Sequence, residues 1–328
     1  MRIGLIDRDK TNFPNLALMK ISAWHKAQGD IVEWHFPLYH YDKVYVSKVF
    51  GDEYAQEDLT LIQADEIVYG GSGYAITVEN GKEVYRKELD KDLPYEIEHI
   101  YPDYSIYPDL TKDTAYGFLT RGCPRACHFC IVSCKEGRAS KKVADLSEFW
   151  NGQKNIKLLD PNILACPQHL DLLKQLADSK ARVDFTQGID ARLITEKNIK
   201  ALMDVKVSDM HFAFDYMENE ELILRGLKIY SDYLDLLHKS KSHISVYILT
   251  NYNTTFEQDW YRVQKVRELG FLPYVMIYRK NTAPKITRYL QRWSNNKFLC
   301  NSVDFMDFVP LTNGKTIREI LEENGGKN

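Results

Sequence analysis

Strand-like segments alternate with helical patterns from residue 116 onward in this 328-residue chain, and this alternation constrains the fold most strongly. Strands are expected at 116–120, 156–160, 182–186, 210–214, 244–249 and 272–278. Apolar residues recur at helical spacing between them, as at Ile223, Leu227 and Tyr230. Such alternation predicts an α/β fold with a parallel sheet and right-handed crossovers.

The carboxyl edge of such a sheet or barrel is where a ligand is expected, because parallel strands bring their following loops together there. The residues that the sequence places at this edge are a cysteine loop after the first strand, Asp160, Gln187, Asp215 and Asn251. We therefore expect the chemistry of the chain at this edge.

The first 95 residues are expected to form a small Rossmann-like α/β domain. Strands are predicted at 2–7, 31–36 and 66–69, with a helix after Pro14 that ends near Gly29. The turn at 70–73 is rich in glycine, which suits either a tight turn or close approach to a neighbour or ligand. Residues 96–115 are expected to be an extended linker, 116–296 the main domain, and 297–328 an extension with one strand and a short helix at 316–323.

Composition excludes several function classes. Net charge is −3, so the whole chain lacks the basic field that drives nonspecific nucleic-acid binding, although a local basic patch remains open. Four of the six cysteines lie between 123 and 134, which indicates a metal or redox site in a reducing compartment rather than a disulfide framework. With no long uncharged apolar run, we expect a cytoplasmic protein that does not enter a membrane.

The cysteine loop has the spacing Cys123-x3-Cys127-x2-Cys130. Three thiolates would fill three iron corners of a 4Fe-4S cluster, since soft sulfur ligands select such clusters. The fourth iron would stay open, and an open iron can chelate the amino and carboxylate groups of a small ligand.

At this motif the chain resembles the radical S-adenosylmethionine (SAM) superfamily. The resemblance rests on the Cys-x3-Cys-x-Phe-Cys loop after residues 117–122 and extends through the βα repeats to about residue 280. It implies a partial (β/α)6 barrel, similar to a TIM barrel, that cleaves SAM reductively to a 5′-deoxyadenosyl radical. It leaves the substrate open among small molecules, peptides and nucleic acids.

The resemblance also implies roles for individual residues in binding SAM. Phe129 matches the aromatic whose backbone meets the adenine, or packs the loop. Asp160 would bind the SAM ammonium by position, although the usual Gly-Gly-Glu is absent and capping before a proline is the alternative. Arg192 would pair with the SAM carboxylate, or with a neighbouring aspartate. Asp215 stands where many relatives carry a glutamate, and Gln187 and Asn251 are further candidates for the cavity.

Two rival readings of the cysteines remain open. Cys134 could supply a fourth thiolate and close the cluster, as in an electron-transfer or scaffold protein, although the first interval differs from that of ferredoxins. Alternatively, His128, Cys134 and Cys166 could help to form a structural zinc site. Cys166 and Cys300 are otherwise expected to be buried.

The amino-terminal domain resembles the cobalamin-binding-like domain of one radical SAM branch through residues 2–7 and the glycine turn. The Asp-x-His-x-x-Gly segment that supplies the lower axial histidine is missing, because 7–12 hold no histidine. This argues against cobalamin, although some members of the branch bind it without that ligand.

A basic run follows the cysteine loop, with four positive charges and one negative charge in residues 135–142. Such a patch would attract an acidic redox partner such as a flavodoxin or ferredoxin, or would simply be a solvated loop.

Overall fold

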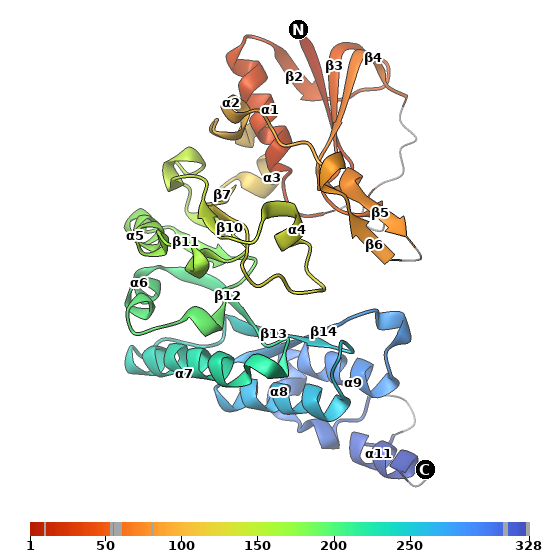
Figure 1. Ribbon diagram of the computed structural model, residues 1–328, viewed down its shortest axis with the longest axis vertical. Helices are drawn as coiled ribbons and strands as arrows, with labels where there is room; N and C mark the ends of the chain where they lie inside the picture. The colour runs from red at the N-terminus through yellow and green to blue at the C-terminus, as the bar shows by residue number, and fades with distance from the viewer. Residues whose placement is uncertain (10, 53–54, 56–60, 80–81, 311–313, 326–328) are drawn as a thin grey trace. The chain divides into compact units, whose positions relative to one another are not determined.

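The computed structural model describes residues 1–9, 11–52, 55, 61–79, 82–310 and 314–325 (Figure 1). Contacts divide the chain into two compact units, Met1–Asp184 and Phe185–Asn328. The division falls within a strand of the main sheet rather than in the expected linker, and the domain boundaries stay predictions.

The first unit begins with a parallel four-stranded sheet of order β2-β1-β3-β4. Its elements are β1 (Arg2–Asp7), α1 (Leu16–Ala27), β2 (Ile31–Trp34), β3 (His40–Ser47) and β4 (Gln63–Gly70). Ile3 and Leu5 of β1 pack against Leu18 and Ile21 of α1, so one core forms between sheet and helix. The expected strands and helix are confirmed, and β3 is an additional strand that the sequence analysis did not predict.

The glycine turn after β4 lies against the loop that follows β3. At Gly71, φ is +97°, and a Cβ would stand 2.4 Å from the carbonyl oxygen of Lys48. The glycine is therefore needed for approach to the protein's own backbone. The turn leads into η2 (Ser72–Ala75), the hairpin β5 (Ile76–Glu79) and β6 (Lys82–Tyr85), and η3 (Lys87–Leu89).

Residues 96–115, expected to be an extended linker, instead contain α2 (Tyr95–Glu98), η4 (Tyr104–Ile106) and α3 (Pro108–Thr111). Asp103 accepts hydrogen bonds from Ser22 Oγ and Lys26 Nζ of α1, each at 2.6 Å. Tyr107 donates its hydroxyl to Asp7 at the end of β1. Asp103 and Tyr107 thus fix this segment to the first sheet and its helix.

The main sheet has six strands in the order β14-β13-β12-β11-β10-β7, with parallel pairing. The strands are β7 (Thr114–Gly117), β10 (Asn155–Leu158), β11 (Arg182–Phe185), β12 (Val207–Ala213), β13 (Ile244–Thr250) and β14 (Leu272–Ile277). A strand is found at each of the six predicted positions, although β7 ends at Gly117 rather than at the predicted residue 120. The chain is α/β with a parallel sheet.

Helices follow the strands as predicted. They are η5 (Leu146–Glu148), η6 (Ile163–Ala165), α5 (His169–Ser179), η7 (Ala191–Leu193), α6 (Asn198–Asp204), η8 (Met217–Asn219), α7 (Glu220–Leu236), α8 (Phe256–Glu268), η9 (Lys280–Thr282) and α9 (Lys285–Ser294). In α7 the predicted apolar face is buried at Ile223, Leu227 and Tyr230. For α5 the helical spacing of Leu170, Leu173 and Ala177 predicts the apolar face. Leu173 is buried as predicted, but Leu170 is exposed and Leu172 and Leu176 are buried instead, so the buried face is rotated.

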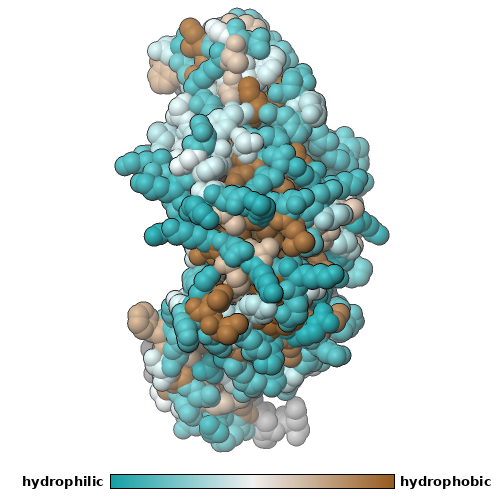
Figure 2. Space-filling view, turned by 90° about the vertical axis from the view of Figure 1, so that its left-hand side faces the viewer, coloured by the Kyte–Doolittle hydropathy of each residue, from teal (hydrophilic) through white to brown (hydrophobic). Residues whose placement is uncertain are grey.

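The carboxy-terminal extension has α10 (Lys297–Ser302), η10 (Phe305–Asp307) and α11 (Ile317–Gly325). The helix expected at 316–323 is confirmed. The expected strand is not found in the described part of the extension, because Asn296 caps α10 by accepting from the amides of Phe298 and Leu299. No described helix has the length and apolar composition needed to cross a bilayer. Hydrophilic residues cover most of the face in Figure 2, between smaller hydrophobic patches.

Candidate functional site

The cysteine loop leaves the carboxyl end of β7 and is closed at its base. Two short strands, β8 (Thr120–Arg121) and β9 (Lys141–Lys142), pair antiparallel on either side of the loop. Inside this pair, the amide of Cys123 donates to the carbonyl of Gly137 at 3.1 Å. The ends of the loop are thus fixed to each other, and the cysteines lie on a segment with a defined base.

Gly122 permits this closure. Its φ is +88°, and a Cβ there would lie 2.2 Å from the carbonyl oxygen of Ala139. The amide of Gly122 donates to Glu136 Oε2 at 3.2 Å, and Glu136 also accepts from Arg121. Any side chain at Gly122 would push the two sides of the base apart.

The three predicted ligands, Cys123, Cys127 and Cys130, are half-buried thiols, and Cys134 is exposed on α4 (Val132–Glu136). Among the described residues no three His, Cys, Asp or Glu side chains converge on a single metal position. A 4Fe-4S cluster does not need such convergence, since each cysteine binds a different iron. Three thiols on one closed loop fit the donor set of a cluster with one open iron.

Phe129 lies between the second and third cysteines and is half-buried. In the same loop the amide of Cys130 donates to the carbonyl of Cys127 at 2.9 Å, and Ala126 has a φ of +49°. This turn places the two cysteines close together along the backbone.

Asp160, predicted from its place after the second strand, holds the segment that precedes the cysteines. Its buried carboxylate accepts from the amide of Leu119 at 2.8 Å and from the amide and hydroxyl of Thr120 at 2.7 and 2.6 Å. Burial raises the pKa of Asp160 to about 7, against the three hydrogen bonds, which lower it. The structure thus gives Asp160 an intramolecular role.

Asn162 is a site residue that sequence reasoning missed. Its Nδ2 lies 3.5 Å from Cys123 Sγ, and its carbonyl accepts from Ser140 Oγ at 2.8 Å. N–H donors to cysteine sulfur tune the reduction potential of a cluster. One indication of this position was present in the sequence, since Asn162 lies two residues after Asp160 in the loop that follows β10.

Cys166 and Cys300 are buried as expected. Cys166 Sγ lies 3.2 Å from Gln168 Oε1 on its own loop. Cys300 lies in the second unit, where Arg267 donates to its carbonyl at 2.9 Å.

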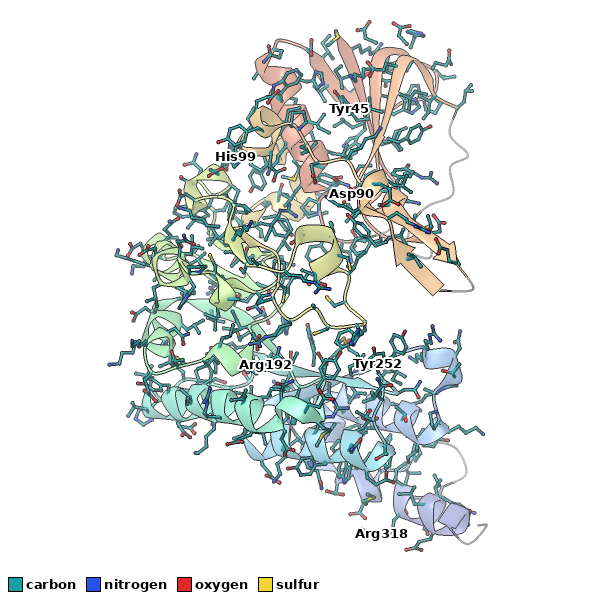
Figure 3. All side chains as sticks on the ribbon, in the orientation of Figure 1. Tyr45, Asp90, His99, Arg192, Tyr252 and Arg318 are labelled. Carbon is teal, nitrogen blue, oxygen red and sulfur yellow. The ribbon has the colours of Figure 1, made fainter. Side chains whose placement is uncertain are left out.

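The other predicted SAM contacts belong to the second unit. Gln187 is exposed in the turn after β11. Arg192 forms a two-pronged ion pair with Asp190, at 2.7 Å from Nε and 3.1 Å from the second nitrogen. This pair is the neighbouring-aspartate alternative that the sequence left open. Arg192 is labelled in Figure 3.

Asp215 and Asn251 hold neighbouring strand ends. Asp215 accepts from the amide of Leu249 at 3.0 Å, and Asn251 Nδ2 donates to the carbonyl of Tyr278 at 2.8 Å. Burial raises the pKa of Asp215. Beneath them the fully buried Arg262 donates to the carbonyls of Phe214 and Leu249 and to Asp259. Sequence reasoning missed Arg262, because a charged residue on a helix is expected at the surface.

In the first sheet, the carboxyl end of β1 is occupied by the protein's own residues. The hydroxyl of Tyr107 bonds Asp7, whose pKa is raised by burial. Asn15, the cap of α1, donates to Ser47 Oγ at the end of β3 at 2.8 Å. Together with the glycine turn packed on Lys48, these contacts give no support to cobalamin at this edge.

The basic run after the cysteines is only partly exposed. Lys135 turns inward and donates to Ser72 Oγ at 3.0 Å, and burial lowers its pKa. Lys142 pairs with Asp145 at 2.6 Å, while Arg138 and Lys141 are exposed.

Comparisons with known proteins add no family. Neither a scan against protein-family models nor a search of curated proteins found a match for the chain.

Proposed function

We propose that this protein is a radical SAM enzyme that holds a 4Fe-4S cluster through Cys123, Cys127 and Cys130. The observation that carries the proposal is the position of the three half-buried thiols, on one closed loop directly after the first strand of a six-stranded parallel sheet. Ligands of parallel α/β sheets bind at that end of the strands. As part of this proposal, the sheet curves into a partial (β/α)6 barrel.

When bound, the cluster supplies an electron for reductive cleavage of SAM. The residues of the chain would hold and orient it. The three cysteines would bind three irons, and Asn162 Nδ2, 3.5 Å from the sulfur of Cys123, would donate an N–H to that sulfur. Asp160 fixes the backbone that leads into the loop.

The remaining SAM candidates support the proposal less. Arg192, Asp215 and Asn251 each have a partner within the chain, so a ligand would have to compete with that partner. Gln187 and Phe129 remain candidates for contacts with SAM. A reducing protein such as a flavodoxin or ferredoxin would supply the electron.

The test is anaerobic reconstitution with iron and sulfide. We expect about four irons per chain, an EPR signal of the reduced cluster that changes when SAM is added, and release of 5′-deoxyadenosine and methionine. Alanine at Cys123, Cys127 or Cys130 should abolish SAM cleavage. Cys134→Ala is the matched control and should keep both iron and cleavage.

Two results would contradict the proposal. Loss of the cluster in Cys134→Ala would favour a closed four-thiolate cluster in an electron-transfer or scaffold protein. Stoichiometric zinc in place of iron, with no response to SAM, would favour a structural metal site.

A further inference from the structure

The second unit carries a run of positive charge that lies outside the proposed cluster loop. Between Glu268 and Asp304 the chain has six Lys or Arg residues and no Asp or Glu, although its net charge is −3. The six are Arg279, Lys280, Lys285, Arg288, Arg292 and Lys297. All are exposed, and within the described residues none forms an ion pair with an acidic side chain.

Helix α9 gathers three of these charges on one side. Lys285, Arg288 and Arg292 are spaced i, i+3 and i+7, which places them on the same face of a helix. Leu290 and Trp293 are buried on the opposite face. The positive face of α9 is therefore fixed outward by the packing of its apolar face.

The loops after β13 and β14 bring an aromatic pair to this region. The rings of Tyr252 and Tyr278 are 4.8 Å apart at 74° and are half-buried. Arg279 and Lys280 follow Tyr278 directly, and Arg288 of α9 donates to the carbonyl of Asn281 in η9 at 3.2 Å. Tyr252 is labelled in Figure 3.

The backbone of these loops is strained. Asn251, Asn253 and Arg279 have φ values of +59°, +52° and +48°, a region that side chains other than glycine rarely adopt. Such residues persist where the surrounding structure fixes them, and they cluster at sites that bind ligands. Here Asn251 is fixed by its bond to the carbonyl of Tyr278.

We propose that this basic face, defined as Tyr252, Tyr278, Arg279, Lys280, Lys285, Arg288 and Arg292, binds a single-stranded nucleic acid. The cations match a phosphate backbone, and exposed base faces can stack on tyrosine rings. In a duplex those base faces are covered, so the aromatic pair selects single strands. The inference does not depend on the proposed cluster, since every residue of the basic face lies outside the cysteine loop.

The experiment measures binding of labelled single-stranded RNA and DNA oligonucleotides of the same sequence to the full chain by fluorescence anisotropy, over a range of salt. We expect binding at low salt that weakens as salt rises. Lys285→Glu with Arg288→Glu should reduce affinity at least tenfold and lower the steepness of log K against log salt by about 1.4, from two lost phosphate contacts. Tyr252→Leu should reduce affinity about tenfold without changing the salt slope.

The matched control is Lys200→Glu with Arg225→Glu, two exposed cations on α6 and α7 of the same unit. It makes the same charge change and should alter affinity less than twofold. Circular dichroism and melting temperature check that all variants fold. The RNA and DNA arms decide which polymer is the ligand.

Four outcomes would overturn the proposal. The first is no binding of either oligonucleotide at low salt, and the second is an equal loss of affinity in both charge-reversal pairs. The third is equal affinity for a duplex and for a single strand of the same sequence, and the fourth is competition by polyglutamate that is as effective as competition by the unlabelled oligonucleotide. The last would indicate an acidic protein partner. Because this assay needs neither cluster nor SAM, its failure would leave the radical SAM proposal standing, and failure of SAM cleavage would leave the basic face standing.

Discussion

Asp160 offers a direct test of the forces that hold the base of the cysteine loop. Its carboxylate accepts three hydrogen bonds from Leu119 and Thr120 and is only 3% exposed. Asp160→Asn keeps the size of the side chain but replaces one oxygen with an NH2 group. Whichever way the amide is turned, at least one donor on Leu119 or Thr120 then faces a donor, and an unsatisfied buried donor costs about 1 to 3 kcal/mol.

The pH dependence of the difference in unfolding free energy shows whether burial or hydrogen bonding controls the protonation state of Asp160. The folded pKa of Asp160, about 7, lies above the unfolded value of 3.8. Proton uptake by the folded state therefore adds stability that is fully present below the unfolded pKa and is lost as pH rises through the folded pKa. At pH 5, two units below the folded pKa, this contribution is roughly 2 to 3 kcal/mol, at about 1.4 kcal/mol per unit. The asparagine variant lacks it.

The assay is urea unfolding of cluster-free wild type and Asp160→Asn at pH 5 and pH 8, followed by circular dichroism. The difference in unfolding free energy between the two proteins should grow by roughly 2 to 3 kcal/mol from pH 8 to pH 5. A difference independent of pH would refute the reasoning. It would mean that the three hydrogen bonds keep Asp160 ionised across this range.

Two further predictions concern the same loop. Gly122→Ala should prevent stable cluster binding, because the added Cβ would lie 2.2 Å from a backbone carbonyl oxygen. Gly152→Ala is the control, since Gly152 has a similar φ of +87° but open space around the Cβ position, and this variant should retain iron. Iron analysis after reconstitution compares the two variants, and equal retention of iron would contradict the steric argument. Lys141→Glu with Lys142→Glu should slow reduction by flavodoxin at low salt and leave dithionite-driven SAM cleavage nearly unchanged. Lys174→Glu, at an exposed lysine remote in sequence, is the control and should slow neither reaction. Equal slowing with both reductants would show that the two lysines shape the active site instead.

The main sheet could be predicted from sequence because each of its strands places at least two apolar residues in a short segment between helical patterns. Strand β3 was missed although it is central in its sheet, since Asp42 and Lys43 separate the buried Tyr41 from the buried Val44 and Val46 and so interrupt the apolar run. The face of α5 was misjudged by one position, which a pattern of closely spaced leucines permits. These errors arise where periodicity alone has to decide between adjacent apolar residues.

The base of the cysteine loop could not be predicted because it depends on contacts distant in sequence. Asp160 reaches Leu119 across 41 residues, and Asn162 reaches Cys123 across 39. The spacing of the cysteines predicts a cluster but contains no information about which residues hold the loop in place. Pairing of strands on either side of a loop is likewise invisible to periodicity when each strand has two residues.

Polar residues at strand ends have two uses that sequence cannot separate, because holding a loop and binding a ligand require the same side chains. The structure separates them by the donors and acceptors already engaged. Asp160 and Asn251 use their polar groups in hydrogen bonds with neighbouring backbone, and Arg192 pairs with Asp190. Leaving a buried donor or acceptor without a partner costs about 1 to 3 kcal/mol, and more for a charged group. A ligand contact at any of them must exceed that cost. The cations of α9 are exposed and have no acidic partners among the described residues, although Arg288 and Arg292 each donate one hydrogen bond to a backbone carbonyl. Charge that the fold leaves exposed and unneutralised is therefore a stronger indication of a binding surface in this protein than polar residues placed at strand ends.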